Sequence, residues 1–139
     1  MTQVDFYTHT EDRLRTAAQL CGKALAKQVR VFCLTDDNAM SERLSKVLWS
    51  TPSVGFLPHC RVAHPLASRT PILIDHAIET LPHHQVLINL SAEAPQIFTR
   101  FERLIEIVST DAADREAARA RFRFYRDRGY AIQTHQWSA

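Results

Sequence analysis

The segment QVDFYTHTEDRLRTAAQLCGKALAKQVRVFCLTDDNAMSERLSKVL (residues 3–48) determines the fold class, because it places a strand, a helix, a strand and a helix in succession. Its start, Gln3–Thr8, alternates and is rich in Val, Phe and Tyr, which is typical of a strand. Val29–Leu34 is a second short run with β-branched and aromatic residues. Thr10, and later Asp36–Asp37, are expected to cap the helices that follow these strands. The chain therefore opens as a β-α-β-α unit.

The rest of the chain continues this alternation. One long connection, Thr51–Pro71, holds four prolines and is expected to be an irregular surface loop. The remaining expected elements are short strands at Ile72–Asp75, Val86–Leu90 and Arg103–Val108, a helical turn at Pro95–Phe101, a helix at about Asp111–Arg128 capped by Gly129, and a last strand at Tyr130–Trp137. This pattern predicts a three-layer α/β fold, with helices on both faces of a mostly parallel central sheet and room for an antiparallel edge strand.

Length and composition define the broad class of protein. With 139 residues, 45% of them hydrophobic, the chain is expected to form one domain over residues 1–139. Its apolar runs are far shorter than the roughly 18 residues that span a bilayer, and Met1–Thr10 lacks the features of a secretion signal. We therefore expect a cytoplasmic protein without membrane contact, whose cysteines Cys21, Cys33 and Cys60 remain reduced.

The residue patterns that an enzyme would need are sparse. A nucleotide-binding turn requires glycines after the first strand, but the three glycines of the sequence are Gly22, Gly55 and Gly129, and the carboxylates in that turn would repel phosphate. Six residues with metal-binding side chains gather in the middle of the chain without the spacing of a ligand motif: His59, Cys60, His64, His76, His83 and His84. No catalytic residue, cofactor or metal is expected, and a nucleotide- or metal-dependent enzyme remains the alternative.

The last helix carries a stripe of arginines. At about 100° per residue, Ala113, Ala117, Ala120 and Phe124 share one side, which we expect to pack on the sheet. The other side combines four arginines with one ring: Arg115, Arg119, Phe122, Arg123 and Arg126. A solvated charged face, with Phe122 under a neighbouring loop, explains this stripe. A docking site for an acidic, apolar segment that ends in a free carboxylate explains it equally, and single-stranded DNA is the competing ligand.

A second candidate surface lies where the second expected helix ends and the long loop begins. It combines large apolar side chains with prolines and a histidine: Leu48, Trp49, Pro52, Phe56, Leu57, Pro58 and His59. Rings in such a position form a protein interface about as often as they form a small satellite core. The sequence leaves both interpretations open.

Three sequence blocks together resemble the DNA polymerase III chi subunit. They are VDFYTH at the start, LW-x-x-P-x-x-x-FLPH at Leu48–His59, and ARARFRFYRDRGY at Ala118–Tyr130, followed by Trp137. Their order, their separations and the total length agree with that family nearly end to end, whereas Cys60–Pro71 fits least well. The resemblance implies a Rossmann-like domain without catalytic activity, which acts as an accessory subunit of the clamp-loader complex in DNA replication.

The resemblance also implies two protein partners. The acidic C-terminal tail of single-stranded DNA-binding protein, which ends in proline and phenylalanine, would bind a basic-aromatic site, so that DNA is reached only indirectly. By position, this site falls on Val108, Arg115, Arg119, Phe122 and Arg123. In this chain a phenylalanine occupies position 122, where tyrosine is usual, and an arginine occupies position 123, where lysine is usual.

The other implied partner is the psi subunit of the polymerase. Its contact surface maps to Trp49 and Phe56. In this family, the same surface is thought to engage a helicase-like repair protein.

Overall fold

A computed structural model describes residues 1–50, 57–77 and 80–138 of the chain. The strands are β1 (Gln3–Thr10), β2 (Val31–Leu34), β3 (His59–Arg61), β4 (Ile72–Asp75), β5 (Val86–Asn89), β6 (Arg103–Ser109) and β7 (Ile132–Gln136). The helices are α1 (Arg13–Ala26), α2 (Asn38–Ser50) and α3 (Ala112–Asp127), with 3-10 turns η1 (Ala67–Arg69) and η2 (Gln96–Arg100). The expected alternation of strands and helices is confirmed.

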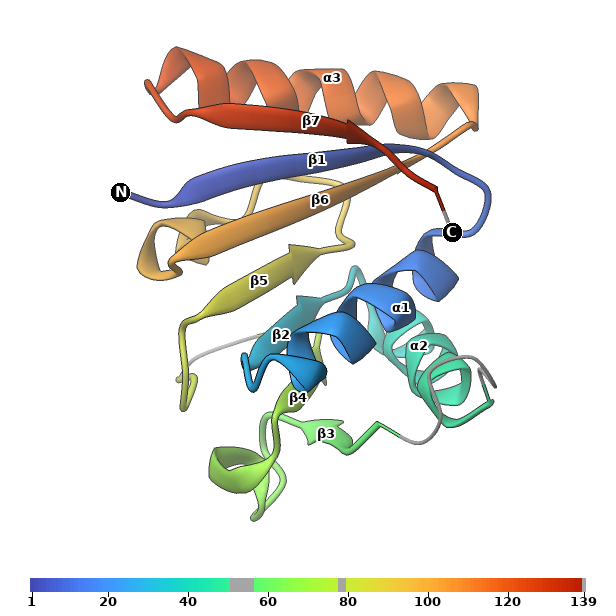
Figure 1. The fold of residues 1–139 in the computed structure, drawn as a ribbon, viewed down its shortest axis with the longest axis vertical. Helices are drawn as coiled ribbons and strands as arrows, with labels where there is room; N and C mark the ends of the chain where they lie inside the picture. The colour runs from blue at the N-terminus through green and yellow to red at the C-terminus, as the bar shows by residue number, and fades with distance from the viewer. Residues whose placement is uncertain (51–56, 78–79, 139) are drawn as a thin grey trace.

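The seven strands form one sheet in the order β3-β4-β2-β5-β6-β1-β7 (Figure 1). Each neighbouring pair is parallel, so the sheet of the described residues has no antiparallel edge strand, although the sequence left room for one. The helices α1 and α2 cover one face, and α3 covers the other. This arrangement confirms the three-layer α/β fold.

Two hydrophobic clusters fill the spaces between the layers. Side chains alternate between the faces of a strand, so each central strand contributes to both clusters. In β2, Val31 and Cys33 pack toward α1 and α2, whereas Phe32 and Leu34 pack toward the face of α3. All four residues are buried, which explains why this strand is a continuous apolar run in the sequence.

The N-cap of the first helix lies two residues later than expected. The carboxylate of Asp12 accepts hydrogen bonds from the backbone N–H groups of Leu14 (3.1 Å) and Arg15 (3.2 Å), so Asp12 is the N-cap of α1. Thr10 instead belongs to β1, and its hydroxyl donates to the carbonyl of Val108 at 3.0 Å. The expected role of Thr10 is therefore wrong, because pairing with β6 keeps this residue in the sheet.

The long proline-rich connection contains a strand that the sequence analysis missed. His59–Arg61 forms β3 and pairs with β4 at the edge of the sheet. Prolines are tolerated beside such a strand because an edge has one unpaired side. Pro58 directly precedes β3, and η1 follows it before β4 begins. The first part of the loop, residues 51–56, lies outside the described residues.

The side of α3 that faces the sheet is also different from the expected one. Ala113 and Ala120 are exposed and Ala117 and Phe124 are only partly buried. The buried side chains of α3 are Ala118, Arg121 and Tyr125. A projection that counts arginine as a surface residue cannot find this side, because here the buried arginine has a buried carboxylate as its partner.

Candidate functional site

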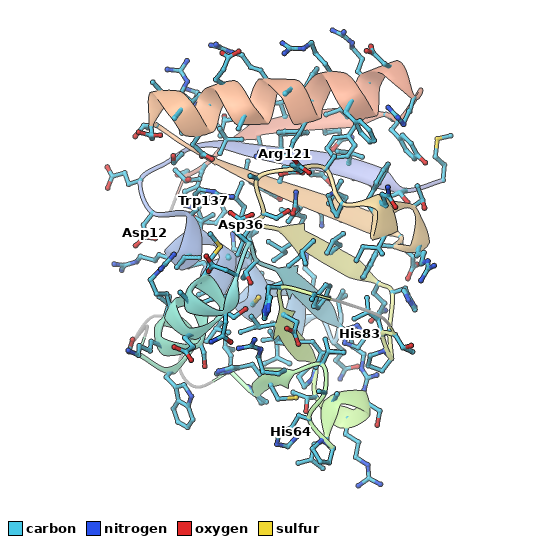
Figure 2. The ribbon with its side chains drawn as sticks, turned by 180° about the vertical axis from the view of Figure 1, so that it is seen from behind. Asp12, Asp36, His64, His83, Arg121 and Trp137 are labelled. Atoms are coloured by element: carbon cyan, nitrogen blue, oxygen red, sulfur yellow. The ribbon has the colours of Figure 1, made fainter. Side chains whose placement is uncertain are left out.

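A buried polar network fixes the rotation of α3 about its own axis. Glu106 of β6 is fully buried, and its carboxylate accepts hydrogen bonds from Arg121 Nε (2.9 Å), Tyr125 Oη (2.6 Å) and Asn89 Nδ2 (2.9 Å). Burial raises the pKa of Glu106, while the charge of Arg121 and the three hydrogen bonds act in the opposite direction. Figure 2 shows Arg121 between α3 and the sheet. Rotating α3 would break these bonds.

With this rotation, Arg115, Arg119 and Phe122 of the arginine stripe lie near the carboxyl ends of β1 and β6. The ring of Phe122 packs edge-to-face on Phe6 of β1, with 5.4 Å between ring centroids and 62° between planes. Phe122 is partly buried and belongs to the edge of the hydrophobic cluster under α3. The sequence placed Phe122 on the side of the helix away from the sheet, and this expectation is wrong. The side of α3 that carries Arg121 faces the sheet, and this rotation brings Phe122 to the edge of the core.

A cavity of about 280 Å³ opens between α3 and the carboxyl ends of β1 and β6; we call it the α3 pocket. Apolar, hydroxyl and cationic side chains line it: Phe6, Thr8, His9, Val108, Ser109, Thr110, Arg115, Ala118, Arg119, Phe122 and Thr134. Val108 is buried, and Arg115 and Arg119 are exposed. The pocket thus combines apolar surface with positive charge.

The structure brings four of the five residues of the expected tail site into this pocket. Val108, Arg115, Arg119 and Phe122 line it. Arg123 does not, although its neighbour in the helix, Phe122, does. Arg119 forms an ion pair with Glu116 at 3.0 Å, in which both side chains are mostly exposed. Such a pair contributes on the order of 0–1 kcal/mol, so a ligand carboxylate can compete for the guanidinium.

Residues of β1 and β7 in the pocket were not found from the sequence. Phe6 and Thr8 are two residues apart, so a strand places them on one face, and this spacing could have indicated them. His9 and Thr134 could not be found in this way. His9 lies at an irregularity of β1. Thr134 lies near the pocket because β7 pairs with β1, and this pairing joins the two ends of the sequence.

The second candidate surface is described only in part. Trp49, in the last turn of α2, is 65% exposed, and its ring lies edge-to-face with His59 of β3 at 6.2 Å between centroids. Leu48 and Leu57 are buried. Phe56, the other residue expected to contact the psi subunit, lies outside the described residues.

Other chemical sites were sought among residues 1–50, 57–77 and 80–138. No group of three or more His, Cys, Asp and Glu side chains in these ranges is placed to hold a metal ion. His59 and His64 instead form local hydrogen bonds, His59 with Ser45 Oγ (2.9 Å) and His64 with the backbone N–H of Leu66 (3.0 Å). None of the helices in the same ranges has the length and apolar character that crossing a membrane requires.

These features define a three-layer, all-parallel α/β protein with a small cationic and aromatic pocket at one end of its sheet. Within that class, residues 1–133 match the family model described as DNA polymerase III chi subunit, HolC. The chain belongs to this family, whose members are accessory subunits of the replicative polymerase.

Three curated proteins named DNA polymerase III subunit chi show the same relationship. The one from Pseudomonas aeruginosa is 35% identical over 140 residues, which cover 98% of this chain and 97% of that protein. The one from Haemophilus influenzae is 28% identical, with 93% of each chain covered. The one from Escherichia coli K12 is 25% identical, with 92% of this chain and 90% of that protein covered. The family resemblance found in the sequence is thus confirmed.

Proposed function

We propose that this accessory subunit is a non-catalytic adaptor of the clamp-loader complex. It binds the acidic C-terminal tail of single-stranded DNA-binding protein in the α3 pocket and the psi subunit at the surface around Trp49. In this way it links the polymerase to coated single-stranded DNA. The observation that carries the proposal is that Val108, Arg115, Arg119 and Phe122, which the family resemblance designates, line one cavity.

The size of the pocket suits the end of a peptide. Its volume of about 280 Å³ lies just below the roughly 300–1,000 Å³ that small-molecule sites occupy. One phenylalanine side chain with its carboxylate fits such a volume. Phe6, Val108 and Phe122 supply apolar contacts for the terminal ring.

The charges of the pocket suit a free carboxyl end. Arg115 and Arg119 are permanently charged and present forked donors that match a carboxylate. Arg123 and Arg126 continue the stripe along the exposed side of α3, where they can attract the acidic residues that precede the terminal ring. Because these charges are exposed, salt is expected to weaken binding.

The two substitutions relative to the family pattern preserve this chemistry. Phe122 retains the ring of the usual tyrosine and loses only the hydroxyl, and its partial burial against Phe6 does not require a polar group. Arg123 retains the charge of the usual lysine. Phe122 and Arg123 are therefore both compatible with the same ligand, an acidic peptide that ends in phenylalanine.

The psi subunit is expected to make an apolar and persistent contact with the surface around Trp49. A ring that is 65% exposed at the end of a helix is the kind of anchor that protein interfaces bury. The helices α2 and α3 cover opposite faces of the sheet, so one partner leaves room for the other (Figure 1). A helicase-like repair protein would compete with psi for the same surface.

Direct binding of single-stranded DNA is the weaker alternative. The net charge of the whole chain is only +2, and nonspecific binding depends on the neutralisation of many phosphates. A nucleotide-dependent enzyme is disfavoured as well, because the carboxylate of Asp12 caps α1 where a phosphate would have to bind.

Titration of a synthetic peptide tests the tail site. The peptide contains several aspartates followed by proline and a C-terminal phenylalanine, and calorimetry measures its affinity at moderate salt. Arg119→Ala is expected to weaken binding by about 1–3 kcal/mol through loss of charge-assisted hydrogen bonds. Arg123→Ala is expected to weaken it by less than about 1 kcal/mol, because Arg123 lies outside the lining of the pocket and acts through an exposed charge. Arg69→Ala is the matched control, since Arg69 is exposed in η1, away from α3. Unchanged affinity in both α3 variants would reject the site.

A further inference from the structure

An irregularity in β1 brings an additional side chain to the α3 pocket. The pairing of β1 with β6 shifts register between Tyr7 and Thr10. Within this interval, His9 has a φ of +63°, in the left-handed region that residues other than glycine seldom adopt. The backbone conformation at this position is thus fixed by the pairing on both sides of it.

The irregularity changes which residues share a face. In a regular strand, Thr8 would lie on the face of Phe6 and His9 on the opposite face. In this structure both Thr8 and His9 line the α3 pocket together with Phe6. A β-bulge has this effect because the extra residue redirects a side chain. His9 therefore enters the pocket wall from β1, whereas Arg115 and Arg119 enter it from α3.

A hydrogen bond orients the imidazole of His9. Its Nδ1 atom lies 2.9 Å from the hydroxyl oxygen of Thr8. In the neutral imidazole with its proton on Nε2, the Thr8 hydroxyl can donate to Nδ1, which lies nearer to it than the carbonyl of His135 at 3.4 Å. This arrangement uses Nδ1 within the protein and leaves Nε2 for a ligand. The side chain of His9 is exposed, so a ligand can reach it.

His9 also marks the boundary between two different electrostatic surroundings. On the pocket side it faces Arg115 and Arg119, and the connection before α3 contributes only the uncharged Ser109 and Thr110. On its other side lies a cavity of about 420 Å³ whose charged lining residues are Glu11, Asp12 and Arg15. An acidic chain is attracted to the first side and meets carboxylates on the second, so its carboxyl end should stop at His9.

We propose that His9 is a further binding residue of the α3 pocket, which donates a hydrogen bond from Nε2 to the terminal carboxylate of the bound acidic segment. This inference rests on the proposed function, since it concerns the same ligand. Protonation of an imidazole adds a positive charge, so the affinity for the carboxylate rises as the pH falls. The site thereby responds to pH, which its arginines alone would not do.

The test combines one substitution with a change of pH. His9→Asn removes the imidazole and keeps a residue that tolerates the left-handed conformation. His64→Asn is the control, because His64 is exposed and lies at the end of the molecule opposite α3 (Figure 2). Calorimetry with the acidic peptide at pH 6.0 and pH 8.0 is expected to show affinity roughly threefold to fivefold higher at pH 6.0 for wild type and His64→Asn, as an exposed charge pair provides. His9→Asn should bind equally at both values.

Two further measurements keep the outcomes separate. A peptide with a C-terminal amide should remove the pH dependence of the wild type, because the carboxylate is absent. NMR of the His9 imidazole should show a shift on addition of the peptide with a free carboxylate, and this measurement needs no variant. The other nearby histidine, His135, is bonded to Asp5, and the His9→Asn comparison leaves it intact. Tight binding with the same pH dependence in His9→Asn overturns the inference about His9, whereas no binding by the wild type overturns the proposed function.

Discussion

Replacement of Glu106 by glutamine should destabilise the protein more than any surface change near the pocket. Glu106 is fully buried and Arg121 is 3% exposed, with 2.9 Å between the carboxylate oxygen and Nε. Glu106→Gln leaves the guanidinium buried without a counter-ion, which costs about 3–5 kcal/mol. Total stabilities of such domains are about 5–15 kcal/mol, so the variant should fold but with a clearly lowered midpoint of unfolding.

Chemical denaturation at pH 7.5 measures this effect directly. Tyr125→Phe is the matched comparison, because it retains the ring and removes only the 2.6 Å hydrogen bond to the carboxylate, for a loss of roughly 1.5–3 kcal/mol. The double variant Glu106→Leu/Arg121→Met should recover part of the loss, since a buried ion pair can be replaced by apolar side chains of similar size, whereas Tyr125 and Asn89 lose the carboxylate that accepts their hydrogen bonds. The three free energies of unfolding together compare the loss of the counter-ion, the loss of the tyrosine hydrogen bond and the removal of both charges.

Glu106→Gln should also alter the α3 pocket. If the network sets the rotation of α3, Glu106→Gln should weaken peptide binding under conditions where the variant remains folded, although Glu106 does not line the pocket. A free energy of unfolding within about 1 kcal/mol of the wild type would refute the reasoning. It would mean that apolar packing of Ala118 and Tyr125 alone positions α3.

Three other predictions concern stability and reactivity. Burial lowers the pKa of His83 to about 4, so the folded state takes up the proton less readily than the unfolded state. The protein should therefore lose up to about 3 kcal/mol of stability as the pH falls from 6.5 to 4. In denaturation experiments at several pH values, His83→Leu should remove this part of the loss. Gly129→Ala should lower the free energy of unfolding by about 1 kcal/mol, because Gly129 has a φ of +83° while nothing lies within 4 Å of an added Cβ. The hydrogen-bonded contact with Cys21 and burial raise the pKa of Cys33, so a thiol reagent should label the partly exposed Cys60 first under native conditions, as mass spectrometry of the labelled chain would show.

Most of the fold follows from patterns that local physics enforces. Buried parallel strands must be apolar on both faces, and amphipathic helices must alternate with them, so the strands at Val29–Leu34 and Val86–Leu90 were correctly placed. The short strand β3 could not be found, because three residues between prolines carry too little periodicity. The cap of α1 was misplaced by two residues because Thr10 and Asp12 are both good caps, and only pairing with β6 distinguishes them.

The site was predictable where it depends on one helix and unpredictable where it depends on several elements. The spacing of Arg115, Arg119 and Phe122 indicated a common surface, and they do line one pocket. The predicted buried face of α3 was wrong, because Arg121 is buried with Glu106 as its counter-ion and Glu106 lies on another element of the fold. The contribution of His9 depends on a backbone irregularity that a single sequence does not reveal.

The position of β1 has a consequence for how the protein is made. β1 lies between β6 and β7, so this early strand hydrogen-bonds to the two described strands that are synthesised last. One edge of the nascent strand remains open until residues 103–109 have emerged and the other until residues 132–136 have emerged, and contacts that are this distant in sequence form slowly. During translation, the open edges of β1 can therefore pair with strands of other chains. A chaperone bound to Gln3–Thr10 would protect these edges until β6 and β7 are available.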